Sequence, residues 1–152
     1  MSDDWIILIP EKPGHVPPEE ARNSALKQFR QIAPDSDEIN IELTEKVRFE
    51  NCGANFEKVL CPDCGKEIEL DWWQERMEED FGEEESFQLG TFKLPCCGVM
   101  RTLHELRYEW PQGFARFSLE AMNPNIGKLS AEARAGLEAA SGCPLRVIYV
   151  HI

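Results

Sequence analysis

The sequence predicts an α+β protein in which a strand–helix–strand unit occurs twice, on either side of a cysteine-rich segment. The first unit occupies residues 1–55 and the second residues 99–152. Residues 56–98 contain four of the six cysteines and would form an inserted zinc-binding module. Two strand–helix–strand units together form a ferredoxin-like sandwich, one antiparallel sheet with two helices on one face. We therefore expect that fold, interrupted by the insert.

The first unit follows from changes in hydrophobic periodicity. Residues 5–9 are all apolar, which is typical of a strand buried on both faces. Two prolines followed by two glutamates at residues 17–20 begin a helix, which Pro34 ends. Residues 39–49 then alternate between apolar and polar side chains. This alternation predicts a long half-exposed strand, or a hairpin bent near Glu45.

The second unit repeats this order. Residues 114–122 alternate as a half-buried strand does, Ser130 is a suitable helix cap, and Gly142 ends that helix. Residues 145–150 form a last strand that is apolar on both faces. Neither the first nor the last strand has a polar face. We therefore expect the insert, rather than water, to cover part of the sheet's second face.

The insert itself predicts one helix between short strands. The helix would be capped by Asp71 and end near Phe81, with Trp73 and Met77 on the same face as Phe81. The short strands are expected at residues 56–60, 67–70 and 87–94.

Four cysteines lie on two turns that each end in glycine: Cys61-Pro62-Asp63-Cys64-Gly65 and Pro95-Cys96-Cys97-Gly98. Two thiolates on a tight turn can bind a metal ion from one side, and the glycine lets backbone amides approach the sulfurs. Two such turns make a tetrahedral four-sulfur site, which suits Zn²⁺ and leaves no position for water or substrate. The sequence therefore predicts a structural zinc ion whose ligands are Cys61, Cys64, Cys96 and Cys97.

Residues 61–98 resemble the zinc-ribbon class, in which a Cys-Pro-x-Cys-Gly turn faces a second cysteine turn at the far end of a hairpin. The second turn departs from that class, because Cys96 and Cys97 are adjacent instead of two residues apart. Adjacent cysteines can both bind one metal ion, since consecutive Cα atoms are ~3.8 Å apart and Zn–S bonds are ~2.3 Å long. Cys52, on another glycine turn, and His104 stay open as alternative fourth ligands.

The formal net charge is −12 and the isoelectric point about 4.7. This charge disfavours binding to nucleic acids and to anionic membranes, and it permits a basic protein partner. Residues 71–85 combine aromatic and acidic side chains, which could dock such a partner. The alternative is that the aromatic side chains pack over the zinc site while the acids face water.

The leading hypothesis is a non-enzymatic, zinc-stabilised protein-binding module, in one specific form an acidic inhibitor or immunity-type protein for a basic target. Two alternatives stay open. One is a hydrolase or thiol enzyme that uses an open zinc ion, or Cys97 with His104. The other is a zinc-handling protein. The sequence contains no glycine-rich phosphate loop, serine nucleophile elbow or His-Glu-x-x-His motif.

The longest apolar run, residues 5–9, is too short to span a bilayer, and the acidic N-terminus is unlike a signal peptide. We therefore expect a cytoplasmic protein, in which clustered cysteines favour metal binding over disulfides. The C-terminal part, from Pro95 to the closing strand, resembles uncharacterised bacterial proteins. That resemblance implies a bacterial source and no mechanism.

Overall fold

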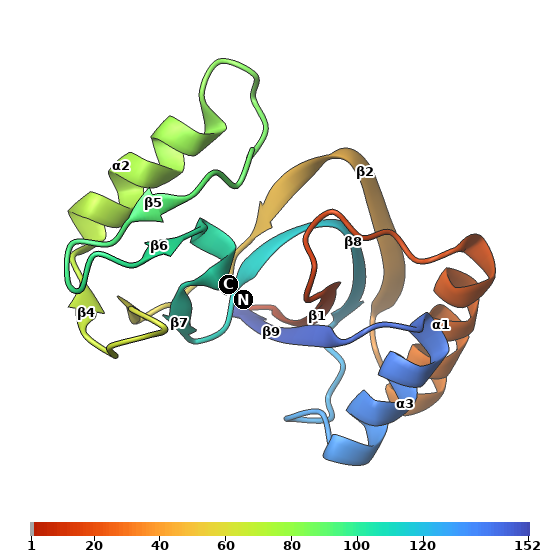
Figure 1. The fold of residues 1–152 in the computed structure, drawn as a ribbon. Coiled ribbons are helices and arrows are strands. Elements are labelled where there is room, and N and C mark those ends of the chain that lie inside the picture. The colour runs from red at the N-terminus through yellow and green to blue at the C-terminus, as the bar shows by residue number, and fades with distance from the viewer. Residues whose placement is uncertain (1) are drawn as a thin grey trace.

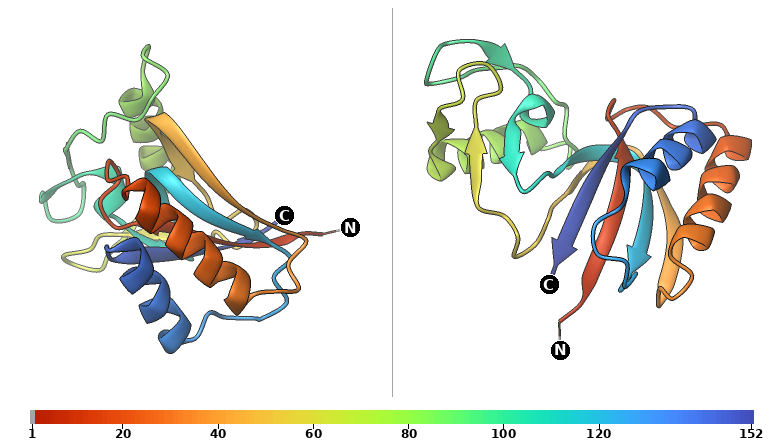
Figure 2. Two further views of the ribbon diagram at one scale, coloured as in Figure 1. Left: turned by 90° about the vertical axis from the view of Figure 1, so that its right-hand side faces the viewer. Right: turned by 90° about the horizontal axis from the view of Figure 1, so that it is seen from below.

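Residues 2–152 are described by a computed structural model, in which three α-helices accompany antiparallel sheets (Figure 1). The largest sheet is antiparallel, and its four strands lie in the order β2 (Glu38–Glu50), β8 (Gly113–Met122), β1 (Asp4–Pro10) and β9 (Leu145–His151). Helices α1 (Glu19–Ile32) and α3 (Ala131–Ser141) pack side by side on one face of this sheet (Figure 2). The expected combination of helices with antiparallel sheets is therefore confirmed.

The main core lies between this sheet and the two helices. Its largest fully buried side chains are Ile6, Leu8, Phe29, Phe117, Leu119, Leu137 and Leu145. On β8 they come from odd-numbered positions, as the alternation in the sequence predicts. Burial of each such side chain stabilises the fold by roughly 1.5–3 kcal/mol. The cap of α3 is also as expected, because the Ser130 hydroxyl accepts a hydrogen bond from the Ala133 amide at 3.1 Å.

Strand β2 is a single long strand with an irregularity in its middle. Its pairing with β8 shifts register between Leu43 and Arg48, which places a β-bulge in the stretch that contains Glu45. The Arg116 side chain donates to the Thr44 carbonyl at 3.1 Å and so fills the gap in the ladder. The long half-exposed strand is confirmed, and the bend expected near Glu45 is a bulge within it.

The chain between β2 and β8 forms smaller elements within residues 58–109, which we call the cysteine module. These elements are β3 (Lys58–Leu60), β4 (Glu67–Ile68), α2 (Leu70–Phe81), β5 (Phe92–Lys93), β6 (Met100–Arg101), the 3₁₀-helix η1 (Leu103–Glu105) and β7 (Arg107–Glu109). Strands β4, β3 and β7 form one sheet, and β5 pairs with β6. The three-stranded sheet therefore includes residues beyond the predicted insert range of 56–98.

Two local predictions in this module are wrong. Helix α2 begins two residues early, after Glu69, so Asp71 lies in its first turn and is not its cap. The strand expected at residues 87–94 shrinks to β5. The reason is Asp80, whose carboxylate accepts from the Leu89 and Gly90 amides at 2.8 and 2.9 Å. Those amides are therefore used by a side chain and not by a neighbouring strand.

The second face of the large sheet carries its own apolar cluster. The cluster contains Ile7, Ile9, Cys52, Ala115, Ile148 and Val150, with Trp5, Phe56 and Trp110 packed against it. Phe56 is the first residue of the expected insert, whereas Cys52 and Trp110 lie outside that range. The cover of this face therefore comes mainly from the segments that flank the expected insert. Across residues 2–152, no helix has both the length and the apolar character that crossing a membrane requires.

A tight turn attaches the segment just before the cysteine module to the last strand. Gly53 adopts a φ of +62° and forms an isolated bridge with His151, and the Ala54 amide donates to the His151 carbonyl at 2.7 Å. A Cβ atom added to Gly53 would collide with the carbonyl oxygen of His151. This position therefore requires glycine for both its backbone conformation and its close approach to β9.

Replacement of Gly53 by alanine should lower the free energy of unfolding by about 2 kcal/mol, because it adds a left-handed backbone penalty to a steric collision. Gly14→Ala is the matched control, since a Cβ atom at Gly14 meets nothing within 4 Å. Urea unfolding of both variants measures the difference. Equal stability of the two variants would show that the turn does not hold the module to β9.

Candidate metal centre

The first cysteine turn follows β3 directly. The Gly65 amide donates to the Cys61 carbonyl at 3.0 Å, and the Cys61 amide donates to the Lys66 carbonyl at 2.9 Å. Gly65 has a φ of +76°, which lets the chain reverse. The amides of Asp63 and Cys64 point at the Cys61 sulfur from 3.4 and 3.5 Å. This arrangement presents a sulfur stabilised by backbone dipoles.

The second turn has the same hydrogen-bond frame. The Gly98 amide donates to the Leu94 carbonyl at 3.0 Å, the Leu94 amide donates to the Val99 carbonyl at 2.9 Å, and Gly98 has a φ of +77°. Leu94 therefore occupies the position that Cys61 holds in the first turn, and Cys97 corresponds to Cys64. A proline follows the first position in both turns.

This correspondence explains the adjacent cysteines. Leu94 is only 1% exposed and packs in the apolar cluster of the cysteine module, so the first position of the second turn is used for the core. The missing sulfur is supplied two residues later by Cys96, at the position of Asp63. Asp63 itself pairs with Arg101 of β6 at 2.8 Å, which links the first turn to the β5–β6 hairpin.

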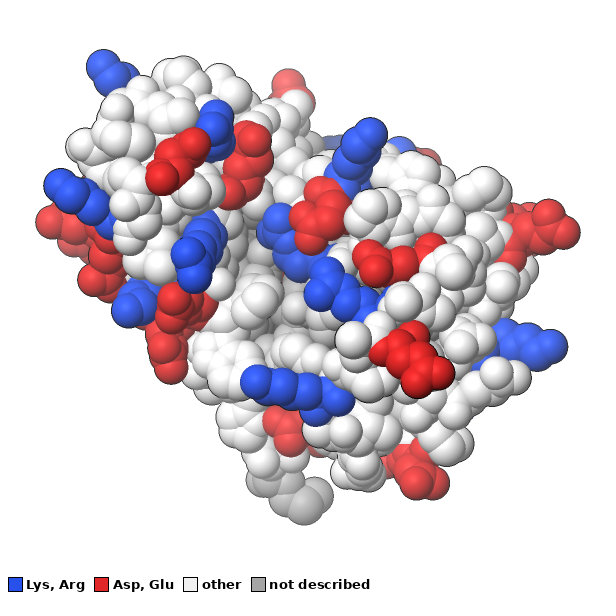
Figure 3. Space-filling view, turned by 60° about the horizontal axis from the view of Figure 1, so that its bottom comes forward, with Lys and Arg blue, Asp and Glu red and all other residues white. Residues whose placement is uncertain are grey.

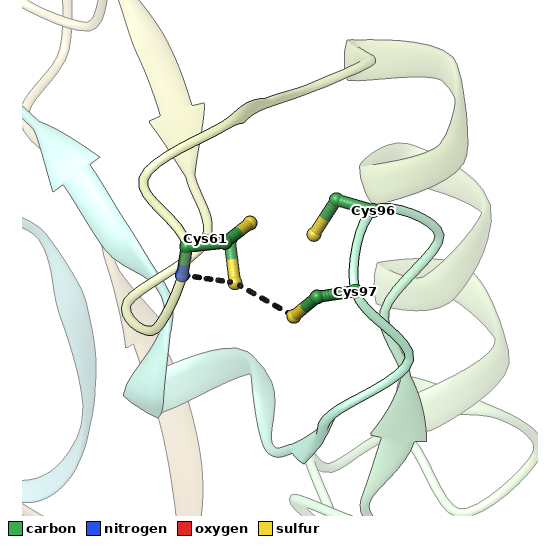
Figure 4. Close-up of side chains that lie close together, drawn as sticks. Cys61, Cys96 and Cys97 are labelled. Carbon is green, nitrogen blue, oxygen red and sulfur yellow. Dashed lines mark hydrogen bonds between the residues drawn. The ribbon is translucent and has the colours of Figure 1, made fainter.

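The structure brings the four predicted cysteines together. Their sulfur atoms all lie within 4.8 Å of one another, and the sulfurs of Cys61 and Cys97 are 3.8 Å apart. The sulfurs of Cys61, Cys96 and Cys97 point toward a shared space between the two turns (Figure 4). Four sulfurs placed tetrahedrally around a metal at ~2.3 Å would be about 3.8 Å apart. The cluster can therefore hold a metal ion without large rearrangement.

The thiols of the cluster differ in acidity. Burial raises the pKa of Cys61, but hydrogen bonds from the amides of Cys64 and Asp63 and from the thiols of Cys96 and Cys64 together lower it to about 7. Burial and the hydrogen bonds with the sulfurs of Cys64 and Cys61 raise the pKa of Cys96 to about 12. The first thiolate therefore forms at Cys61, and binding of a metal cation to the other sulfurs must release protons.

The cluster is buried on one side and open on the other. Cys61 is buried and Cys96 half-buried, whereas Cys64 and Cys97 are exposed. The buried side belongs to a cluster of apolar and aromatic side chains that includes Val59, Leu94 and Trp73. A metal ion here would therefore be bound by both buried and exposed cysteines, and would link the apolar core of the cysteine module to the exposed parts of the two turns.

The structure places the two alternative ligands elsewhere. The Cys52 sulfur donates to the Gln112 side-chain oxygen at 3.4 Å, within the cluster on the second face of the sheet. His104 is buried: its Nε2 lies 2.8 Å from the Glu11 carbonyl, and its Nδ1 accepts from the Phe114 amide at 3.0 Å. Both ring nitrogens of His104 are therefore occupied, and neither is free for a metal ion or for Cys97.

His104 instead fastens η1 to the end of β1 and the start of β8. Gly113 makes this possible, because a Cβ atom there would lie 2.9 Å from Nδ1 of His104 and 2.8 Å from the guanidinium of Arg146. Burial, followed by the nearby charge of Arg146, lowers the pKa of His104 to about 4. The imidazole is therefore neutral at physiological pH, with its proton on Nε2.

A second group of carboxylates was not predicted from the sequence. Oxygens of Glu42, Glu50 and Glu120 lie within 4.8 Å of one another on neighbouring strands β2 and β8. Burial and the proximity of Glu42 raise the pKa of Glu120 to about 7. Arg48 bonds to Glu50 at 2.8 Å and to the buried Ser118 hydroxyl at 2.6 Å, and so offsets part of the negative charge. The sequence does show that Glu42 and Glu50 have the same parity along β2. It does not show how β2 pairs with β8 across the bulge, and that register brings Glu120 beside them.

Comparison of the chain with protein-family models, with curated proteins and with solved structures finds no match in any of the three. The geometry of the site therefore carries the functional argument.

The pH dependence of stability should report the buried neutral His104. Its folded pKa of about 4 lies below the ordinary value of 6.5, so as pH falls the unfolded chain gains a proton that the folded chain does not. Between pH 6.5 and about pH 5 this should remove about 1–2 kcal/mol of stability.

His104→Asn retains an acceptor for the Phe114 amide and lacks the titrating ring, so it should lose less stability over that range. Urea unfolding of both proteins at the two pH values measures the difference. The two chains share every other titrating group. Identical losses would contradict the assignment of a buried neutral imidazole.

Proposed function

We propose that this chain is a zinc-stabilised protein-binding module whose acidic surface docks a basic protein. The zinc part rests on the donor set, since four sulfurs that lie within 4.8 Å of one another suit Zn²⁺ better than harder cations. Four protein ligands would leave no open position, so the ion would stabilise and not catalyse. In small zinc peptides such binding is worth on the order of 10 kcal/mol. The ligands would be Cys61, Cys64, Cys96 and Cys97.

The finer fold assignment is part of the proposal. The strand order β2-β8-β1-β9, with α1 after β1 and α3 after β8 along the chain, supports a ferredoxin-like classification. The shared hydrogen-bond frame of the two turns supports a zinc-ribbon-like module inserted between the halves of that sandwich. In this view the sandwich is the platform that carries the module.

The observation that carries the binding proposal is the surface of α2 and its flanks. We call it the α2 acidic surface, and its exposed carboxylates are Glu67, Glu69, Asp71, Glu75, Glu78, Glu79, Glu83, Glu84 and Glu85. A single cation on this helix, Arg76, pairs with Glu75 at 3.3 Å and Glu79 at 3.1 Å. The remaining negative charge would attract a basic partner and speed its encounter.

The aromatic side chains of α2 hold the helix on the module. Trp73 is buried against the rings of Phe49, Phe56 and Tyr108, and its indole nitrogen donates to the Tyr108 hydroxyl at 3.1 Å. Trp73 is therefore an internal anchor, as the alternative reading of the sequence expected. The apolar side chains left at the ends of α2 are Leu70, 42% exposed, and Phe81, 38% exposed. A partner would combine contacts to these two with pairing to the acids.

The specific form that we propose is an inhibitor or immunity-type protein acting in a bacterial cytoplasm. Such a protein needs a preformed acidic face, and a helix packed on a metal-stapled module provides one. A reducing compartment would keep the four thiols available for the metal ion. A nucleic acid is the wrong partner for this surface, because phosphates would be repelled.

The protein purified under reducing conditions should contain one zinc ion per chain. Cys61→Ser and Cys97→Ser should each weaken zinc affinity by more than tenfold and lower the melting temperature, because each removes a thiolate ligand. Cys143→Ser is the control, since that thiol lies outside the cluster. Metal analysis and competition with a chelator provide the measurement. Full zinc content in both ligand variants would refute the four-cysteine site.

Neutralisation of the α2 acidic surface should weaken partner binding about tenfold, which corresponds to about 1.4 kcal/mol spread over three charges. The variant is Glu78→Gln/Glu83→Gln/Glu84→Gln, which leaves both pairs of Arg76 intact. The control, Glu19→Gln/Glu45→Gln/Glu132→Gln, changes the net charge equally at exposed positions outside the surface.

The measurement is retention of basic proteins from a lysate of the organism that encodes the chain, at low and raised salt. Wild type and control should retain the same basic protein at low salt and release it at high salt, while the α2 variant should lose it. Equal retention by the two variants would place the binding surface elsewhere.

A further inference from the structure

A hollow lined by three arginines lies on the surface of a protein that is acidic overall. It has a volume of about 440 Å³ and runs along β9, the edge strand of the large sheet, to β7, the edge strand of the small sheet. Arg107 comes from β7, Arg134 from α3 and Arg146 from β9. On the face shown in Figure 3, Lys and Arg side chains surround a hollow near the middle of the molecule. We call this hollow the arginine pocket.

The charges of the pocket do not cancel. Glu11 is its one lining carboxylate, and it pairs with Arg146 through two contacts of 3.2 and 3.0 Å. Within residues 2–152, Arg107 and Arg134 form no ion pair with a carboxylate. The pocket therefore carries two uncompensated positive charges in a chain whose net charge is −12. In a concave site such charges focus the field on an incoming anion.

Two of the three guanidinium groups, those of Arg134 and Arg146, are held in place before any ligand arrives. Arg134 donates to the Leu145 carbonyl at 2.7 Å, which leaves its other N–H groups available. Arg146 donates to the carbonyls of His104 and Gln112 at 3.1 and 2.9 Å, besides its pair with Glu11. Arg146 therefore forms part of the pocket wall. The remaining N–H groups of Arg134 and those of the exposed Arg107 are free to bind an anion. A planar fork of donors matches a carboxylate or phosphate group.

The rest of the wall is apolar and aromatic. It includes Leu106, Leu129, Val147 and Tyr149, and the Tyr149 hydroxyl accepts from the Leu129 amide at 2.9 Å. That bond fixes the ring beside the pocket. The volume lies within the range of about 300–1,000 Å³ that small-molecule sites occupy. An apolar wall next to convergent donors is the usual composition of such a site.

We propose that the arginine pocket binds a small organic anion, with its carboxylate or phosphate group on Arg107 and Arg134 and its apolar body against Leu106, Leu129 and Tyr149. The pocket uses other residues than the α2 acidic surface and the cysteine cluster. The inference is therefore independent of the proposed function, and the outcome of either test leaves the other unaffected.

Phenyl phosphate and benzoate are the probes for the two oxyanions, and inorganic phosphate is the probe without an apolar body. Titrations of the zinc-loaded full chain, followed by calorimetry and by shifts of the arginine side-chain N–H signals, are made at constant ionic strength. At least one aromatic probe should bind one per chain, about tenfold more tightly than inorganic phosphate, and shift the Arg107 and Arg134 signals.

Arg107→Gln/Arg134→Gln should weaken binding of that probe by at least tenfold. The matched control is Lys27→Gln/Arg30→Gln, which removes the same charge from exposed positions on α1. The proposal is overturned by an absence of saturable binding of both aromatic probes up to about 10 mM, where a pocket with any useful affinity would be occupied. Equal weakening in both double variants, or equal affinity for inorganic phosphate, would overturn it too.

Discussion

A buried polar junction joins the cysteine module to the large sheet, and the rest of the structure depends on it. Arg146 on β9 bonds to Glu11 after β1 and to the carbonyls of His104 and Gln112. The imidazole of His104 bonds in turn to the Glu11 carbonyl and to the Phe114 amide. Both ring nitrogens of the buried His104 thereby have a partner, which offsets the cost of removing them from water. The same junction forms one wall of the arginine pocket and orients the segment that leads back to β8.

The cysteine module has little regular structure with which to stabilise itself. Its strands are two or three residues long, so their ladders contain few hydrogen bonds. Elements of this size usually need a cross-link, such as a disulfide or a bound metal ion, in addition to an apolar core. Here the core is aromatic and centred on Trp73 and Tyr108, and the four cysteines lie at its edge. The use of Leu94 for that core, and the resulting shift of a sulfur to Cys96, show how closely core and cluster are connected.

Charge is distributed unevenly over the molecule. Exposed carboxylates concentrate on α2 and its flanks, whereas three arginines line a pocket at the opposite edge of the module. The net charge of −12 does not show this separation, because it sums the charges of both surfaces. A protein with such a distribution can present an attractive face to a cationic partner and still offer a site to a small anion.

The sequence by itself determined the elements whose causes are local. Hydrophobic periodicity located β1, β2, β8 and β9, Ser130 and Gly142 bounded α3, and the two glycine-ended turns identified the four clustered cysteines. Where a distant side chain intervened, local reasoning failed, as when Asp80 took the amides that a strand after Phe87 would have used.

Only the tertiary structure decided which residues meet. His104 and Cys52 were open as ligands until their partners were known, and both prove to be bonded within the junction or the sheet. The three carboxylates on β2 and β8 depend on a register shifted by a bulge, and the arginine pocket gathers residues from three elements far apart in the chain. Spacing along the chain reports a contact only when the partners are neighbours in sequence, and these contacts are formed by strand pairing and packing across long separations.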